Sequence, residues 1–232
     1  MPLKELAVDL KAIRDSIGPK TKLIFIANPN NPTGFALFKE DLAYFLRDLP
    51  DDLVVVLDEA YIEFVTDHRV TSALKLLDMH PHLLVLRTFS KLYGLAGLRI
   101  GCGFSSEKII DYMNRVRQPF NANALAQAAA LAALEDHEFV ADTLELVREG
   151  LAQLTKGLGS LGLSYFPTQT NFFLIKTPLA GKTVYERMLR RGVIVRAMDS
   201  FGFPDYIRIN VGLPEENERF LNTLKEVLEI SK

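Results

Sequence analysis

Three short apolar runs, separated by stretches with helical spacing, constrain the fold of this chain more than any other feature. The runs are 23–27, 53–57 and 82–87, and helix-type stretches fall between them at about 39–48 and 71–79. Strands that alternate with helices in this way predict a parallel sheet covered by helices. A fourth apolar run, 98–104, follows the third through a loop rather than a helix. We therefore expect it to pair antiparallel.

The second half of the chain changes pattern. Residues 121–134 are rich in alanine and almost uncharged, which predicts a buried helix, and 136–156 predict a long amphipathic helix. The glycine-rich block 157–162 is the best candidate for a linker. Short strands near 163–166, 171–175, 193–196 and 206–211 then alternate with helices at 182–191 and 214–230. We predict a large domain over 1–156 and a small C-terminal α+β domain over 157–232.

Composition narrows the class of protein. Hydrophobic residues make up 48% and charged residues 24% of the 232 residues, and the net charge is −2. These values are typical of soluble globular proteins and give no sign of a nucleic-acid or acidic-membrane partner. The chain contains no apolar run long enough to cross a membrane and no signal-peptide pattern at its start. A single cysteine, Cys102, excludes an internal disulfide and is expected to be buried. These features predict a cytoplasmic protein.

Polar residues follow each of the three strands that we expect to be parallel. Asn31 comes after the first, Asp58 ends the second and Lys91 follows the third. Ligands bind at the carboxyl ends of the strands in open α/β sheets. A lysine just beyond a strand can form a Schiff base with a carbonyl cofactor. A carboxylate that ends an apolar strand needs a partner, and a protonated pyridine nitrogen would be a suitable one.

The residues around the lysine suit a phosphate group. Thr88 and Ser90 supply hydroxyl groups, and Arg99 supplies a guanidinium eight residues after Lys91. Tyr61, three residues after Asp58, could reach the same ligand.

These motifs together resemble a known family. The sequences Asn-Pro-Asn-Asn-Pro-Thr-Gly at 28–34, Asp-Glu-Ala-Tyr at 58–61 and Thr-Phe-Ser-Lys at 88–91, with Arg99, occur in the order found in fold-type-I pyridoxal-phosphate (PLP) aminotransferases. The resemblance implies an α/β fold. Its large domain would be a truncated fold-type-I PLP-transferase domain, with a mostly parallel sheet and helices on both faces. A small C-terminal α+β domain would follow.

The resemblance also implies roles for the site residues. Lys91 would carry the internal aldimine and move a proton between Cα and C4′, and Asp58 would pair with the pyridine nitrogen. Hydrogen bonds to the phenolic oxygen would come from Tyr61 and Asn31. The remaining residues would hold the cofactor phosphate, namely Thr88, Ser90 and Arg99.

The C-terminal part is similar to histidinol-phosphate aminotransferases. The similarity lies in Gly-Val-Ile-Val-Arg at 192–196 and in the stretch 200–217 that contains Arg208. It implies that Arg196 and Arg208 face the anionic group of the substrate. The implied reaction belongs to histidine biosynthesis and transfers an amino group between histidinol phosphate, or a similar amine or amino acid, and 2-oxoglutarate. A bidentate guanidinium suits both phosphate and carboxylate. The alternative is that both arginines form salt bridges at strand ends.

The sequence also departs from the family pattern. Family members carry a substantial segment ahead of the first residue matched here. That segment supplies the first strands of the large sheet, a phosphate-binding helix N-terminus, a ring-stacking aromatic residue and a tyrosine donated across the dimer. None of these can be placed in this sequence. We therefore expect a short sheet with two uncovered edges and an oligomer, at least a dimer, that covers part of the exposed apolar surface.

Other functions remain open. Aromatic aminotransferases and phosphothreonine decarboxylases share the scaffold, and the chain could also be a non-catalytic or weakly active PLP-binding remnant. The run 54–59 resembles a Walker B strand and 180–183 the end of a Walker A loop, but Lys176 stands where that loop needs a glycine. We predict no metal site, because the four histidines have no partner at ligand spacing.

Overall fold

The computed structural model describes residues 3–4 and 6–228, and the chain divides into two compact units. The N-terminal unit comprises residues 1–31 and 35–141, and the C-terminal unit comprises 32–34 and 142–232. The division falls within helix α5 (His137–Ser160), which contributes to both units. The domain boundary expected at residues 156 and 157 stays a prediction.

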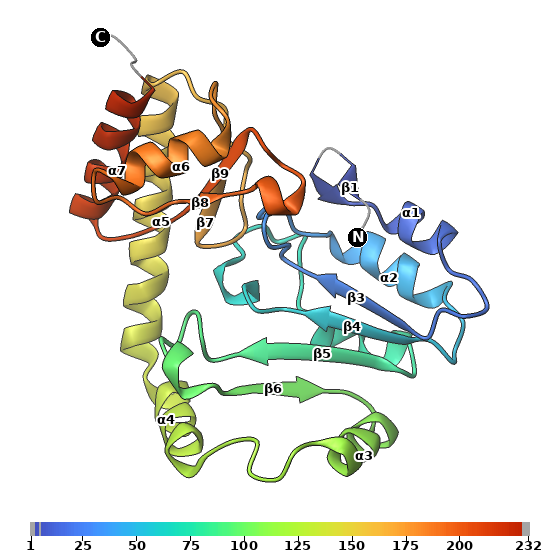
Figure 1. Cartoon of the computed structure of the whole chain (residues 1–232). Helices are drawn as coiled ribbons and strands as arrows, with labels where there is room; N and C mark the ends of the chain where they lie inside the picture. Colours follow the sequence, from blue (N-terminus) through green and yellow to red (C-terminus); the bar gives the residue numbers. More distant parts are fainter. Residues whose placement is uncertain (1–2, 5, 229–232) are drawn as a thin grey trace. The chain divides into compact units, whose positions relative to one another are not determined.

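A four-stranded sheet forms the centre of the N-terminal unit, in the order β3-β4-β5-β6 (Figure 1). The strands are β3 (Leu23–Ala27), β4 (Val54–Asp58), β5 (Leu83–Thr88) and β6 (Gly101–Phe104). The first three run parallel, and β6 pairs antiparallel with β5. The mostly parallel sheet and the antiparallel fourth strand are therefore both confirmed.

Short helices precede, separate and follow these strands. They are α1 (Leu10–Asp15), α2 (Lys39–Arg47), α3 (Glu107–Val116) and α4 (Ala124–Glu135), with 3-10 helices η1 (Ile62–Phe64), η2 (Ala73–Met79) and η3 (Ala96–Leu98). A two-stranded hairpin, β1 (Leu3–Lys4) and β2 (Ala7–Val8), precedes them. Asp9 caps α1, because its carboxylate accepts a hydrogen bond from Ala12 N at 2.8 Å.

One face of the sheet forms the main core of this unit. Phe45 of α2 is buried in one cluster with Ile26 of β3 and Leu57 of β4. Successive residues of a strand point to opposite faces. Leu23 and Phe25 therefore point away from this core, and they are 53% and 67% exposed.

Helix α4 and Cys102 are more exposed than the sequence suggested. Only Ala126 and Ala130 of α4 are buried, whereas Leu125 and Leu131 are 78% and 67% exposed. A helix that is apolar on all sides does not reveal from its sequence which side is packed. Cys102 is exposed and lies on β6, one of the two edge strands of the sheet.

The C-terminal unit contains a three-stranded antiparallel sheet in the order β7-β9-β8 (Figure 1). Its elements are β7 (Phe172–Lys176), β8 (Arg196–Ala197), β9 (Tyr206–Asn210), 3-10 helix η4 (Asp199–Phe201), α6 (Gly181–Leu189) and α7 (Pro214–Val227). The core joins Leu154 of α5, Phe173 of β7 and Leu224 of α7. Of the strand expected near 163–166, only an isolated bridge between Tyr165 and Ile175 forms.

The glycine-rich stretch 157–162 is not a linker throughout, because α5 continues to Ser160. A Cβ atom at Gly157 would lie 2.3 Å from Leu221 of α7. This glycine therefore permits close packing between two helices instead of breaking one. The prediction failed because glycine serves both purposes.

The packing of β6 on β5 generates a prediction. A Cβ atom at Gly101 would lie 2.6 Å from the Arg87 carbonyl oxygen, whereas one at Gly97 would meet nothing within 4 Å. We expect Gly101→Ala to lower the free energy of unfolding by about 1–3 kcal/mol, because strand backbones must separate. Gly97→Ala is the control and should change it by less than about 0.5 kcal/mol. Urea denaturation measures both, and equal effects would contradict the strand packing described here.

Candidate active site

Backbone hydrogen bonds continue the pairing beyond the ends of the parallel strands. Asn28 N donates to Asp58 O at 2.9 Å, which joins the end of β3 to that of β4. Glu59 N donates to Leu86 O at 3.0 Å, which joins the end of β4 to β5. The carboxyl ends of the three strands therefore form one continuous edge, from which the predicted site residues begin.

Lys91 and Tyr61 meet at this edge. The Lys91 Nζ atom lies 5.2 Å from the centre of the Tyr61 ring. Tyr61 is buried and Lys91 is exposed, so the aromatic ring forms a fixed surface beside an accessible amine. An ammonium group is attracted to the face of such a ring. The structure thus brings together two residues that lie thirty positions apart in the sequence.

Hydrogen bonds between its own residues hold the loop after β5. Ser90 N donates to Thr88 Oγ1 at 3.1 Å, and Gly94 N donates to the Lys91 carbonyl at 3.1 Å. Gly94 has a φ of +68°, which favours glycine and lets the chain reverse after the lysine. Thr88, Ser90 and Lys91 are therefore presented on one tight turn.

Arg99 follows the 3-10 helix η3 and lies outside that turn. Its backbone has a φ of +57°, and its Nη1 atom donates to the Ala96 carbonyl at 2.8 Å. The side chain is exposed. Its assignment to the cofactor phosphate stays a prediction.

Asp58 occupies the end of β4 and is exposed. Its Oδ1 atom accepts a hydrogen bond from Ala60 N at 3.0 Å, which fixes the direction of the carboxylate. Asp58 lies opposite Leu86 in the sheet, and Thr88 is two residues further along β5. Because side chains alternate along a strand, Asp58 and Thr88 occupy the same face. Asn31 is exposed beyond the end of β3.

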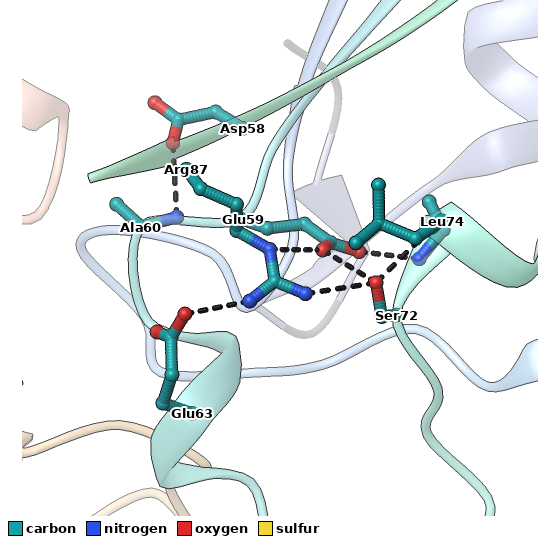
Figure 2. Close-up of polar contacts among 8 residues, drawn as sticks. Asp58, Glu59, Ala60, Glu63, Ser72, Leu74 and Arg87 are labelled. Atoms are coloured by element: carbon teal, nitrogen blue, oxygen red, sulfur yellow. Dashed lines mark hydrogen bonds and ion pairs between the residues drawn. The ribbon is translucent and has the colours of Figure 1, made fainter. Parts of the chain in front are cut away.

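The sequence analysis missed a cluster of charged and polar residues behind this edge (Figure 2). Arg87 donates from Nε to Glu59 at 2.8 Å, from Nη1 to Glu63 at 2.6 Å and from Nη2 to Ser72 at 2.8 Å. Burial raises the pKa of Glu59, and the bonds from Ala73 N, Arg87 and Ser72 oppose that rise. We call these four side chains the Arg87 cluster. The signal in the sequence was a pair of opposite charges at the ends of two apolar runs, Glu59 after 53–57 and Arg87 at the end of 82–87.

The C-terminal unit brings Arg196 and Arg208 together. The two residues are directly opposite each other in β8 and β9 and therefore share a face of the sheet. Both line a pocket of about 810 Å³. The Arg196 and Arg208 guanidinium groups lie 5.6 Å and 4.8 Å from the rings of Phe201 and Phe172. Two guanidinium groups on one face of a sheet and beside one pocket are able to bind an anion together.

The described residues were also compared with the patterns of a metal site and of a membrane-spanning helix. No group of three or more His, Cys, Asp or Glu side chains there is placed to hold a metal ion. Over the same residues, no helix is long and apolar enough to cross a membrane.

The fold and the edge residues define the class. A mostly parallel sheet that presents a lysine, an aspartate and an asparagine at its carboxyl edge is the arrangement expected of a fold-type-I PLP-transferase. The chain matches the family model for aminotransferase class I and II over residues 2–224, and it belongs to that family.

Individual relatives agree with this assignment. The chain is 47% identical over 229 residues to histidinol-phosphate aminotransferase 1 of Nitrosococcus oceani, covering 99% of this chain and 62% of that protein. It is 48% identical over 220 residues to histidinol-phosphate aminotransferase 2 of Pseudomonas aeruginosa, covering 95% and 60%. The chain thus spans about three fifths of the length of these curated relatives.

A solved structure confirms the fold. The histidinol-phosphate aminotransferase of Sinorhizobium meliloti, in complex with pyridoxal-5'-phosphate, superposes with a TM-score of 0.87 at 28% identity. The match covers 95% of this chain and 61% of that one. The resemblance to fold-type-I aminotransferases that the motifs indicated is therefore confirmed.

Proposed function

We propose that the protein is a PLP-dependent aminotransferase that transfers an amino group between histidinol phosphate, or a similar amine or amino acid, and 2-oxoglutarate. The observation that carries the proposal is the accessible Lys91 amine held beside Tyr61 at the edge where Asp58 ends β4. The names of the curated relatives support the choice of histidinol phosphate.

The side chains at the edge match the chemical groups of PLP. Lys91 offers an amine to the cofactor carbonyl, and Asp58 offers an exposed carboxylate to the ring nitrogen. Asn31 and Tyr61 can donate hydrogen bonds to the ring oxygen. The phosphate would be held by the hydroxyl groups of the turn after β5 and by a guanidinium, from Thr88, Ser90 and Arg99. Bound PLP draws electrons away from the substrate α-carbon and so lets a proton leave.

The residues of the chain then have separate tasks. The Asp58 carboxylate, fixed by Ala60 N, would keep a proton on the ring nitrogen. Lys91 Nζ would take the proton from the substrate α-carbon and return it at C4′ of the cofactor, two bonds away across the nitrogen that joins them. The Tyr61 ring limits where Lys91 Nζ can lie, because it packs against that amine. This restraint suits proton transfer between two nearby carbon atoms on one face of the cofactor.

The paired arginines of the C-terminal unit give the proposed substrate class. A phosphate or carboxylate would bind between Arg196 and Arg208, which lie opposite each other in β8 and β9 and line the same pocket. Both arginines can bind either anion through two parallel hydrogen bonds. One pocket could therefore accept histidinol phosphate and 2-oxoglutarate in turn.

We also propose that the chain assembles with itself, at least as a dimer. Over the described residues, the outer edges of β3 and β6 have no neighbouring strand. Large apolar side chains are exposed on β3, on α4 and in the loop before it, where Phe120 is 96% exposed. Such edges and patches recruit other chains.

Cofactor attachment provides a direct test. We expect the protein, mixed with PLP and reduced with borohydride, to carry the cofactor covalently on Lys91, as located by peptide mass spectrometry. Lys91→Ala should abolish the label, because Lys91 Nζ is the amine that the structure places beside Tyr61. Lys108→Ala, a change at an exposed lysine on α3, is the control and should keep it. Labelling of another lysine would show that the site is wrong.

The arginine pair can be tested by substrate binding. We expect Arg196→Ala and Arg208→Ala each to weaken the binding of histidinol phosphate about tenfold to a hundredfold, because a charged hydrogen-bonding partner is lost. PLP affinity should be unchanged. Arg148→Ala is the control, since Arg148 pairs with Glu145 on the surface of α5. Titration calorimetry measures these affinities, and loss of PLP with unchanged substrate affinity would contradict the assignment.

Assembly can be measured by size exclusion coupled to light scattering. We expect a mass at least twice the 26.0 kDa of one chain. Phe25→Lys should shift the distribution toward monomer, because it places a charge on the exposed face of β3. A compact monomer over a wide range of concentration would refute self-assembly.

A further inference from the structure

The Arg87 cluster joins three segments of the N-terminal unit through one guanidinium. Glu59 follows the end of β4, Glu63 lies in η1 and Ser72 precedes η2. Arg87 donates one hydrogen bond to each of them. Figure 2 shows the guanidinium at the centre, with the three partners around it.

The cluster is buried and its central carboxylate is fully hydrogen-bonded. The side chain of Glu59 is 0% exposed, that of Arg87 is 20% exposed and that of Glu63 is 15% exposed. Glu59 also accepts hydrogen bonds from Ser72 Oγ and Ala73 N. Removing one partner of a buried ion pair leaves the other charge uncompensated, which is strongly unfavourable. The positions of these residues are therefore tightly specified.

The residues next to the cluster in sequence belong to the proposed cofactor site. Asp58 precedes Glu59, and Thr88 follows Arg87. Because neighbouring strand residues point to opposite faces, the cluster holds the backbone from behind while Asp58 and Thr88 face the other way. Figure 2 shows the Asp58 carboxylate directed away from the Arg87 guanidinium.

The backbone on both sides of Tyr61 is fixed by the cluster. Glu59 precedes Tyr61 by two residues and Glu63 follows it by two, and both carboxylates bind the Arg87 guanidinium. The turn that carries Tyr61 is thus closed by one side chain from β5. The Tyr61 ring in turn contacts Lys91 Nζ.

We propose that Arg87 is a positioning residue for the PLP site. By binding Glu59, Glu63 and Ser72, it fixes Asp58 and Tyr61 at the end of β4 relative to Thr88 and Lys91 after β5. The planar guanidinium is needed because three partners lie in three directions, which one lysine ammonium on a flexible stem cannot reproduce. The expected effect of Arg87 on PLP binding rests on the proposed function. Its expected effect on the turn that carries Tyr61 does not.

PLP affinity is the first readout. We expect Arg87→Met and Arg87→Lys to weaken PLP binding about tenfold to a hundredfold, because Asp58 and Tyr61 lose their fixed positions. Borohydride should still attach PLP to Lys91 at saturating cofactor. Glu63→Gln keeps an acceptor for Nη1 and should retain most of the affinity, whereas Glu63→Leu should not. Comparing the two Glu63 variants tests the positioning role even if changes at Arg87 prevent folding.

Hydrogen exchange without cofactor is the second readout. We expect faster exchange of the Glu59 and Phe64 amides in Arg87→Met, with little change in α2. Arg14→Met is the matched control, since it removes another partly buried ion pair, Arg14 to Asp48, away from the strand ends. It should lower the unfolding midpoint without changing PLP affinity.

The outcomes separate the two proposals. Unchanged PLP affinity in folded Arg87→Met, or equal weakening in Arg14→Met, would overturn the positioning role. If wild-type protein is not labelled at Lys91, the proposed function fails instead. The exchange of the Glu59 and Phe64 amides then still decides whether Arg87 fixes the turn.

Discussion

Parallel pairing of β3, β4 and β5 is the constraint on which the proposed cofactor site depends. It brings three strand ends to one edge, and backbone bonds from Asn28 to Asp58 and from Glu59 to Leu86 extend the pairing into the loops. Each loop therefore begins at a fixed point. Residues far apart in sequence, such as Tyr61 and Lys91, can then meet without any direct bond between their backbones.

At the end of β4, two neighbouring carboxylates have opposite environments. Asp58 is exposed, and the only side-chain hydrogen bond described for it comes from Ala60 N, so it remains available to a ligand. Glu59 is buried, and its oxygens accept from Arg87, Ser72 and Ala73. The alternation of a strand produces this difference. Asp58 is accessible at the end of β4, and the neighbouring Glu59 fixes that strand end by binding Arg87 of β5.

The sequence predicted the sheet and the polar residues that follow its strands, since apolar runs and their polar ends are local signals. The roles of these polar residues stay a prediction. It did not predict the exposure of α4, because an alanine-rich helix lacks a distinct apolar face. It also misjudged Gly157, whose close contact with Leu221 depends on a helix far along the chain. The Arg87 cluster was missed for the same reason, since Glu59 and Arg87 become partners only when β4 and β5 pair.

Arg87 and Arg196 differ in burial and in whether a carboxylate balances their charge. The charge of Arg87 is balanced by Glu59 and Glu63, and each of its three nitrogens already donates a hydrogen bond within the cluster. Among the described residues, by contrast, no carboxylate forms an ion pair with Arg196, which is exposed opposite Arg208 and beside Phe201. An aromatic face holds a guanidinium in place without neutralising it. Arg196 therefore keeps a positive charge that no carboxylate among the described residues balances, whereas Glu59 and Glu63 balance the charge of Arg87.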